Sequence, residues 1–176
     1  GGEFKIGVIP TVMPTLLPMF LANFIHRYPK VKLRIEELTT ENIIDGLIEG
    51  IIDVAIAATP LNNALIKEKV LYYEPFVVYD PASNKKSSQL LSADDIDMER
   101  LLLLEDGHCF KDSVLNLCRS SREVKDEKFM LESGSFETLV KLADEGLGMT
   151  LLPYLHTLDL FEGKKQNLRF FEEPSP

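Results

Sequence analysis

In the first part of the chain, short apolar runs typical of strands alternate with stretches in which apolar residues recur at helical spacing. Runs rich in β-branched residues predict strands at Phe4–Ile9, at residues 31–38 and at residues 52–58. Between them, apolar residues at helical spacing predict two helices, one ended by Pro29 and the other by Gly50. The order is therefore strand, helix, strand, helix, strand, which predicts a mainly parallel sheet with helices on both faces.

This order changes at Leu65–Tyr79, which we interpret as a long extended crossing into a second lobe. Beyond it, strands and helices alternate again. The predicted elements are a strand at Leu101–Leu104, a helix at Asp112–Ser121, strands within residues 128–133 and 147–153, and a helix from Ser135 as N-cap to Gly146. We therefore predict lobe I over residues 1–72, lobe II over residues 73–153, and a segment at residues 154–176 that returns toward lobe I.

Composition and charge narrow the possible functions. The chain has 176 residues, 45 % of them apolar, which is enough to build cores without disulfides or metals. Its net charge is −9 and its cations are not clustered, so this stretch has no nucleic-acid surface of its own. No apolar run approaches the roughly eighteen residues of a membrane span, and no signal-peptide pattern is present. We expect a cytoplasmic protein without membrane contact.

The segment LLLLEDGHCFKDSVLNLC, residues 101–118, contains both cysteines of the chain, Cys109 and Cys118. On one helix they would lie about 13 Å apart along the axis and on nearly opposite faces. Since a disulfide needs α-carbons within about 7 Å, the helix would have to unfold before the two sulfurs could bond. Two buried thiols that stay reduced are the ordinary alternative in a cytosolic protein. Cys118 shares a core-facing stripe with three apolar residues, Phe110, Val114 and Leu117.

Cys109 has the sequence context of a reactive thiol. It follows a predicted strand and begins a predicted helix, where free backbone N–H groups favour negative charge. His108 precedes it, and Lys111 follows two residues later. These features predict a lowered thiol pKa and a good nucleophile, although a small residue in a turn would explain the position equally well.

Three other cysteine chemistries fit less well. A cysteine phosphatase would need Arg six residues after its Cys, where this chain has Leu115. Zinc binding by His108 and the two cysteines would need a fourth ligand. A cysteine hydrolase would need a nearby His, and none of the three histidines lies in a recognisable hydrolase motif. They are His26, His108 and His156. We predict no metal and no cofactor.

Several segments resemble the effector domains of LysR-type transcriptional regulators. IGVIPTVMPTLLP (6–18), GLIEGIIDVAI (46–56) and ESGSFETLVKLADEGLGMTLLP (132–153) follow the family pattern in the same order. The cysteine segment resembles the redox segment of the family's hydrogen-peroxide-sensing activators. The resemblance implies an α/β fold of two Rossmann-like lobes of the type-II periplasmic-binding-protein kind, with a site between them and the redox segment, residues 101–121, in lobe II.

The resemblance also implies roles for individual residues. Cys109 matches the peroxidatic thiol and Cys118 the resolving thiol, with His108 and Lys111 beside the reacting sulfur. Thr11 and Thr40 match two threonines that hold peroxide. For each threonine an ordinary N-cap is the alternative, and the neighbouring Thr39 could serve in place of Thr40.

We therefore predict a regulatory domain that senses hydrogen peroxide through a reversible Cys109–Cys118 disulfide and is not an enzyme. Glutaredoxin or a similar thiol reductant would reset it. Two alternatives are a LysR-type domain that binds a small organic effector between the lobes and a thiol peroxidase. The family implies a homodimer or homotetramer, and DNA contact only through an N-terminal winged helix-turn-helix that this stretch lacks. A return strand and a final helix are expected beyond Pro176.

Overall fold

The chain folds into two units. The structure is a computed structural model that describes residues 2–86, 88–104, 113–114, 116–117 and 135–173. The described residues up to Tyr72 belong to unit 1, and those from Tyr73 onward belong to unit 2.

Unit 1 contains a three-stranded parallel sheet in the order β2-β1-β3. Its elements are β1 (Glu3–Val8), α1 (Met13–Arg27), β2 (Lys32–Glu37), α2 (Thr40–Ile48) and β3 (Val54–Ile56). In the register of the sheet, Val8 lies opposite both Glu37 of β2 and Ile56 of β3. The carboxyl ends of all three strands therefore lie at the same edge.

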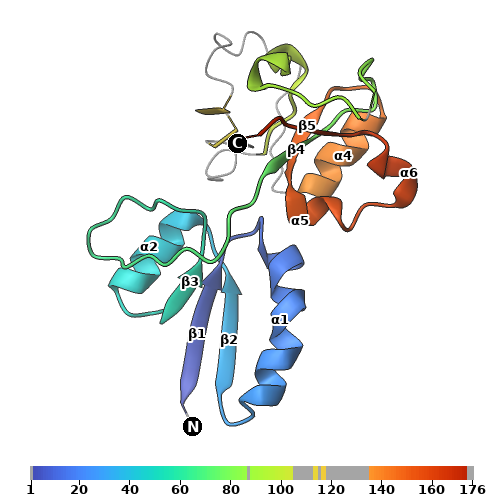
Figure 1. Cartoon of the computed structure of the whole chain (residues 1–176). Helices are drawn as coiled ribbons and strands as arrows, with labels where there is room; N and C mark the ends of the chain where they lie inside the picture. The colour runs from blue at the N-terminus through green and yellow to red at the C-terminus, as the bar shows by residue number, and fades with distance from the viewer. Residues whose placement is uncertain (1, 87, 105–112, 115, 118–134, 174–176) are drawn as a thin grey trace. The chain divides into compact units, whose positions relative to one another are not determined.

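The two helices of unit 1 lie on opposite sides of this sheet (Figure 1). The chain moves from β1 to β2 in one direction and from β2 to β3 in the other, so two right-handed crossovers place their helices on opposite faces. A cluster of Ile9, Ile43 and Ile52 forms the core beneath α2. The predicted parallel sheet with helices on both faces is thus confirmed for this unit.

Unit 2 contains a second three-stranded sheet, in the order β5-β4-β6. Its elements are β4 (Phe76–Tyr79), two short 3-10 helices at Ala93–Asp95 and Met98–Arg100, α4 (Phe136–Asp144), β5 (Thr150–Pro153), α5 (Tyr154–Thr157), α6 (Glu162–Lys165) and β6 (Leu168–Phe170). Helix α4 begins as predicted, because the Ser135 side chain accepts a hydrogen bond from the Thr138 N–H. It ends before Gly146, whose φ of +83° suits glycine.

Alternate residues of the unit 2 strands enter two different cores. On one face Val77, Tyr79 and Leu152 pack with residues of α4 such as Leu139 and Val140. On the other face, which we call the second face, Val78 and Leu151 pack in a cluster with Leu91, Ile96, Val114, Met149 and Phe171. The sheet is therefore covered on both sides, and each side has its own cluster of apolar residues.

Unit 2 differs from the predicted pattern in three ways. Strand β4 is antiparallel to both neighbours, because the chain leaves β5, passes through α5 and α6, and returns as β6 on the other side of β4. Leu101–Leu104 is not a ladder strand and forms only an isolated parallel bridge between Leu101 and Met149. The segment at residues 154–176 was expected to return toward lobe I, whereas strand β6, in its described part, pairs within unit 2.

Candidate functional site

Four predicted site residues, His108, Cys109, Lys111 and Cys118, lie outside the described residues. The same holds for most of the predicted helix that joins the cysteines and for the strand predicted within residues 128–133. The structure does describe the threonines, the residues leading into the cysteine segment, and two apolar residues between the cysteines.

Thr11 and Thr40 lie at the same edge of the unit 1 sheet. Each follows the last residue of its strand by three positions, Val8 in β1 and Glu37 in β2. Because β1 and β2 are adjacent and parallel, the chain leaves the sheet at the same edge toward Thr11, which precedes α1, and toward Thr40, the first residue of α2. This is the edge at which open α/β sheets bind ligands.

Neither threonine is an N-cap. Val12 occupies the N-cap position of α1 and makes no side-chain cap bond. At α2 the cap is Thr39, whose side chain accepts a hydrogen bond from the Asn42 N–H at 3.3 Å. Among the described residues, no partner takes up the hydroxyl of Thr11 or Thr40. The ordinary capping explanation thus fails for both, and the alternative residue Thr39 is already used by its helix.

Thr11 is buried, with 7 % of its surface exposed, whereas Thr40 is half-buried. Among the described residues, no fully buried side-chain oxygen or nitrogen lacks a hydrogen-bond partner, so the Thr11 hydroxyl is not cut off from the surface although most of the residue is buried. A small polar ligand could therefore reach this hydroxyl and donate to it or accept from it. The threonines therefore present the chemistry expected of a site for a small polar molecule.

The residues before the cysteines are fixed to unit 2 by backbone bonds. The Leu102 N–H donates to the Met149 carbonyl at 2.7 Å, and the Met149 N–H donates to the Arg100 carbonyl at 2.8 Å. The Thr150 hydroxyl donates to the Leu102 carbonyl at 3.0 Å in a buried position. The side chains of Leu102 and Leu104 enter the α4 core, while those of Leu101 and Leu103 pack on the second face.

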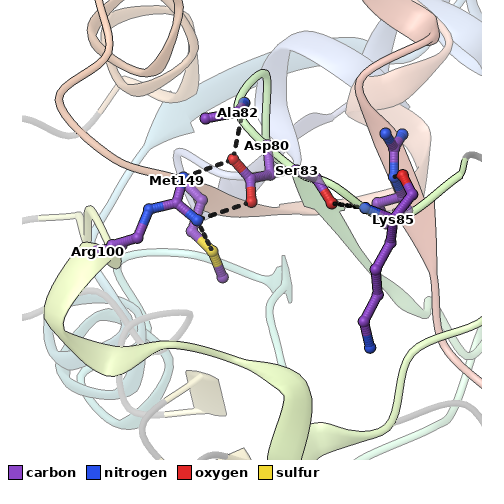
Figure 2. Close-up of polar contacts among 7 residues, drawn as sticks. Asp80, Ala82, Ser83, Lys85, Arg100 and Met149 are labelled. Carbon is purple, nitrogen blue, oxygen red and sulfur yellow. Dashed lines mark hydrogen bonds and ion pairs between the residues drawn. The ribbon is translucent and has the colours of Figure 1, made fainter.

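An ion pair reinforces this attachment (Figure 2). Arg100 Nη2 donates to Asp80 Oδ1 at 2.7 Å and Nη1 donates to Oδ2 at 3.0 Å, so the pair is bidentate. The bonded carboxylate raises the pKa of Arg100 above its ordinary value, which keeps the guanidinium charged. Figure 2 also shows Nη1 directed at the Met149 sulfur, 4.0 Å away. This pair was not among the sequence predictions, and its only signal in the sequence is Asp80 at the end of the apolar run FVVY.

Two residues between the cysteines pack on the second face of unit 2. Val114 is 1 % exposed and belongs to that cluster, and Leu117 is partly buried against it. Residues 113, 114, 116 and 117 are helical. These positions agree with the predicted core-facing stripe at its two described members; its other two members lie outside the described residues.

The His156 ring packs against the Phe136 ring with centroids 5.3 Å apart, and burial lowers its pKa. In the part of the chain that the structure describes, no group of three or more His, Cys, Asp or Glu side chains could hold a metal ion. No helix among the described residues has the length and apolar content to span a membrane.

Comparison with known proteins gives a family match over nearly the whole chain. Residues 1–175 match the LysR substrate binding domain. A probable hydrogen peroxide-inducible genes activator of Mycobacterium leprae is 38 % identical over 153 residues, 86 % of this chain and 49 % of that protein. The HTH-type transcriptional regulator EstR of Acinetobacter baylyi is 33 % identical over 152 residues, 86 % of this chain and 50 % of that protein. The chain spans about half the length of these relatives.

Solved structures of similar fold include two regulators called OxyR. The reduced OxyR regulatory domain from Pseudomonas aeruginosa is 31 % identical, with a TM-score of 0.82 over 99 % of this chain and 84 % of that chain. A hydrogen-peroxide-bound mutant of Corynebacterium glutamicum OxyR is 31 % identical, with a TM-score of 0.84 over 97 % of this chain and 54 % of that chain. The two-lobed, periplasmic-binding-protein-like fold expected from the sequence is confirmed by these matches.

Proposed function

We propose that this chain, which belongs to the LysR substrate-binding domain family, senses hydrogen peroxide through a reversible disulfide between Cys109 and Cys118. It is a regulatory domain of the OxyR type, from a class of transcriptional regulators rather than enzymes. One relative is named as a probable hydrogen peroxide-inducible genes activator, and one similar solved structure has hydrogen peroxide bound. Both support the choice of oxidant.

One structural observation carries the proposal: residues between the two cysteines form part of a core. Nine positions separate the cysteines, which on a helix corresponds to about 13 Å, whereas a disulfide needs α-carbons within about 7 Å. On the predicted helix that joins the cysteines, bond formation would therefore distort the segment that includes Val114 and Leu117. Because both side chains pack on the second face of unit 2, a chemical change at sulfur becomes a change of packing.

The proposed chemistry has two balanced steps. The Cys109 thiolate attacks one oxygen of hydrogen peroxide, the S–O bond forms as the O–O bond breaks, and hydroxide leaves with a proton as water. Cys118 then attacks the Cys109 sulfur, the S–S bond forms as the S–O bond breaks, and a second water leaves. Peroxide is reduced by two electrons and the two thiols are oxidised. Thiolate character at Cys109, favoured by His108 and Lys111 beside it, governs the first step.

The threonines fit the first step. A peroxide molecule offers two hydrogens and two acceptor oxygens, and hydroxyl groups can both donate and accept. Thr11 and Thr40 have hydroxyls without partners in the described part of the chain and lie at the ligand edge of a parallel sheet. We assign them to binding and orienting the peroxide, with no metal or cofactor involved.

The proposed function also implies three partners: a second copy of the chain, DNA and a thiol reductant. Helix α1 supports pairing of two copies, because it carries large apolar side chains that remain exposed, among them Met19 at 55 % and Ile25 at 53 %. We propose a homodimer or homotetramer whose packing changes on oxidation, acting in the cytoplasm. DNA would be contacted through a separate helix-turn-helix region of the whole regulator, and a thiol reductant such as glutaredoxin would restore the reduced state.

EstR favours a second candidate function, since that relative is not named as a peroxide sensor. In this alternative the ligand edge of unit 1 binds a small organic effector and the cysteines are incidental. A thiol peroxidase remains the third possibility, because it would use the same first step.

Mass spectrometry after one equivalent of peroxide separates the three. A loss of two hydrogens, with no continuing consumption of peroxide, supports the sensor. Continuing consumption in the presence of a thiol reductant contradicts it in favour of a peroxidase, and an unchanged mass contradicts it in favour of effector binding. A Cys109→Ser, Cys118→Ser double variant is the control for oxidation at methionine.

A further inference from the structure

Arg100 and the first residues of the cysteine segment make more contacts with unit 2 than the isolated bridge between Leu101 and Met149. The Met149 N–H donates to the Arg100 carbonyl, and the Met149 carbonyl accepts from the Leu102 N–H. Gly148 lies so close that a Cβ at this position would be 2.1 Å from the Arg100 carbonyl oxygen. Residues 100–102 are thus in direct backbone contact with residues 148–149.

Asp80 is also held by hydrogen bonds that do not involve Arg100. Its backbone N–H donates to the Asn167 carbonyl at 3.0 Å, and its Oδ1 accepts from the Ala82 N–H at 3.1 Å. The Asp80 side chain is 8 % exposed, whereas that of Arg100 is 36 % exposed. The carboxylate is therefore a stationary acceptor, and the guanidinium is the group that reaches it. Figure 2 shows Arg100 extending toward the Asp80 carboxylate from the chain that precedes the cysteines.

We propose that the Asp80–Arg100 pair is a positioning device for the redox segment, and this rests on the function proposed above. The pair keeps residues 100–104 attached to unit 2 in both redox states. Rearrangement on oxidation then begins beyond Leu104, and the cost of closing the disulfide falls on a shorter stretch of chain. Arg100 is a positioning residue in this sense, since it acts on Cys109 only through the backbone between them.

This assignment predicts a direction. If Arg100 releases Asp80, the residues before the cysteines can also move, and the distortion needed for the disulfide spreads over more residues. The disulfide should then form more favourably. At the same time the chain that leads to Cys109 loses its anchor at Arg100, so the first reaction with peroxide should slow.

The test measures the midpoint potential of the Cys109–Cys118 couple in the whole chain, in dithiothreitol buffers, for wild type and Arg100→Met. We expect the equilibrium constant for disulfide formation to rise about threefold or more, which makes the potential about 14 mV more negative. The matched control is Lys164→Met, which breaks the 2.9 Å Lys164–Asp144 pair of the same unit far from residues 100–104 in sequence. That variant should lose thermal stability without the change in potential.

Two further variants guard against a failure to fold. Arg100→Lys keeps the charge and loses the bidentate geometry, so a smaller shift in the same direction is expected. Asp80→Asn keeps an acceptor for the Ala82 N–H and should also shift the potential to more negative values. If Arg100 variants have the wild-type potential, a less negative one, or the same potential as Lys164→Met, the positioning role is overturned. A wild-type chain that forms no disulfide contradicts the proposed function itself.

Hydrogen exchange gives a second measurement that does not depend on the potential. The Leu102 amide, bonded to the Met149 carbonyl, should stay protected in wild type before and after oxidation. In Arg100→Met it should exchange faster after oxidation. Loss of Leu102 protection in oxidised wild type would overturn the claim that residues 100–104 remain attached.

Discussion

The Thr39 side chain accepts a 3.3 Å hydrogen bond from the Asn42 N–H, and this bond separates the roles of two adjacent threonines. Thr39 caps α2, whereas the hydroxyl of Thr40 has no such use. Thr39→Ala should therefore lower the free energy of unfolding by about 1 kcal/mol and leave the rate of Cys109 oxidation unchanged. Thr40→Val should instead slow the oxidation of Cys109 and leave the free energy of unfolding nearly unchanged. Chemical denaturation and stopped-flow oxidation of both variants measure the two effects, and a slower reaction only in Thr39→Ala would exchange the roles.

Thr11→Val should slow oxidation of Cys109 much more than it lowers stability. A hydroxyl that orients peroxide acts mainly in the transition state, and each factor of ten in rate corresponds to about 1.4 kcal/mol. Replacing a hydroxyl that has no partner among the described residues should cost the fold little. Thr15→Val is a useful comparison, because the Thr15 hydroxyl bonds the Val12 carbonyl within α1. A rate reduction below about threefold for Thr11→Val would leave Thr11 without the assigned role.

Sequence periodicity predicted unit 1 well because its elements are defined by local patterns. The three strands and two helices lie within a few residues of the predicted positions, since each apolar period is bounded by a turn or by Pro29 or Gly50. Unit 2 was predicted less well. The direction of β6 depends on its pairing with β4, which no local pattern encodes, and its central residue is the buried cation Arg169. That charge is satisfied by three backbone carbonyls, of Lys85, Gln166 and Leu168.

In the candidate site too, residues defined by local patterns were predicted and residues that meet only in the folded chain were not. Thr11 and Thr40 could be located from strand ends and from the family resemblance, because both depend on a motif next to a strand. The Asp80–Arg100 pair could not, since its two side chains are twenty positions apart in sequence and meet only after β4 and residues 98–100 are in place. The cysteines were proposed from spacing and resemblance, and their roles stay predictions.

The two cysteines should behave differently when replaced one at a time. Cys109→Ser should abolish the response to peroxide, because the nucleophile is lost. Cys118→Ser should leave a longer-lived sulfenic acid at Cys109, because the resolving thiol is missing. Dimedone labelling followed by mass spectrometry measures that acid. The assignment is reversed if Cys118→Ser labels no more than wild type while Cys109→Ser still oxidises.

His156 should make the reduced domain less stable as the pH falls. Burial lowers the pKa of this imidazole, and Asp159 and Glu137 offset only part of that effect. The unfolded chain, with a His pKa near 6.5, then takes up the proton first, so stability is retained above about pH 6.5 and lost as the pH falls through the folded value. Urea unfolding between pH 7 and 5 should show a smaller loss for His156→Asn than for wild type. The exposed His26 provides the control variant, His26→Asn.

Val114 and Val140 test whether the second face of unit 2 takes part in the switch. They are 1 % and 2 % exposed, but Val114 lies between the cysteines and packs on the second face, whereas Val140 lies in α4 on the opposite face. Replacing either with Ala should lower the free energy of unfolding of the reduced form by about 2 kcal/mol.

Only one of these losses should depend on redox state. If the disulfide pulls Val114 off its cluster, Val114→Ala costs little in the oxidised form, and the potential of the couple becomes about 40 mV more negative. Val140→Ala should destabilise both forms equally and leave the potential where it is. Denaturation of reduced and oxidised protein, together with the potentials, measures both effects. Equal destabilisation of the two redox forms by Val114→Ala would mean that the packing of this residue survives oxidation, and the coupling between sulfur chemistry and the core of unit 2 would have to be abandoned.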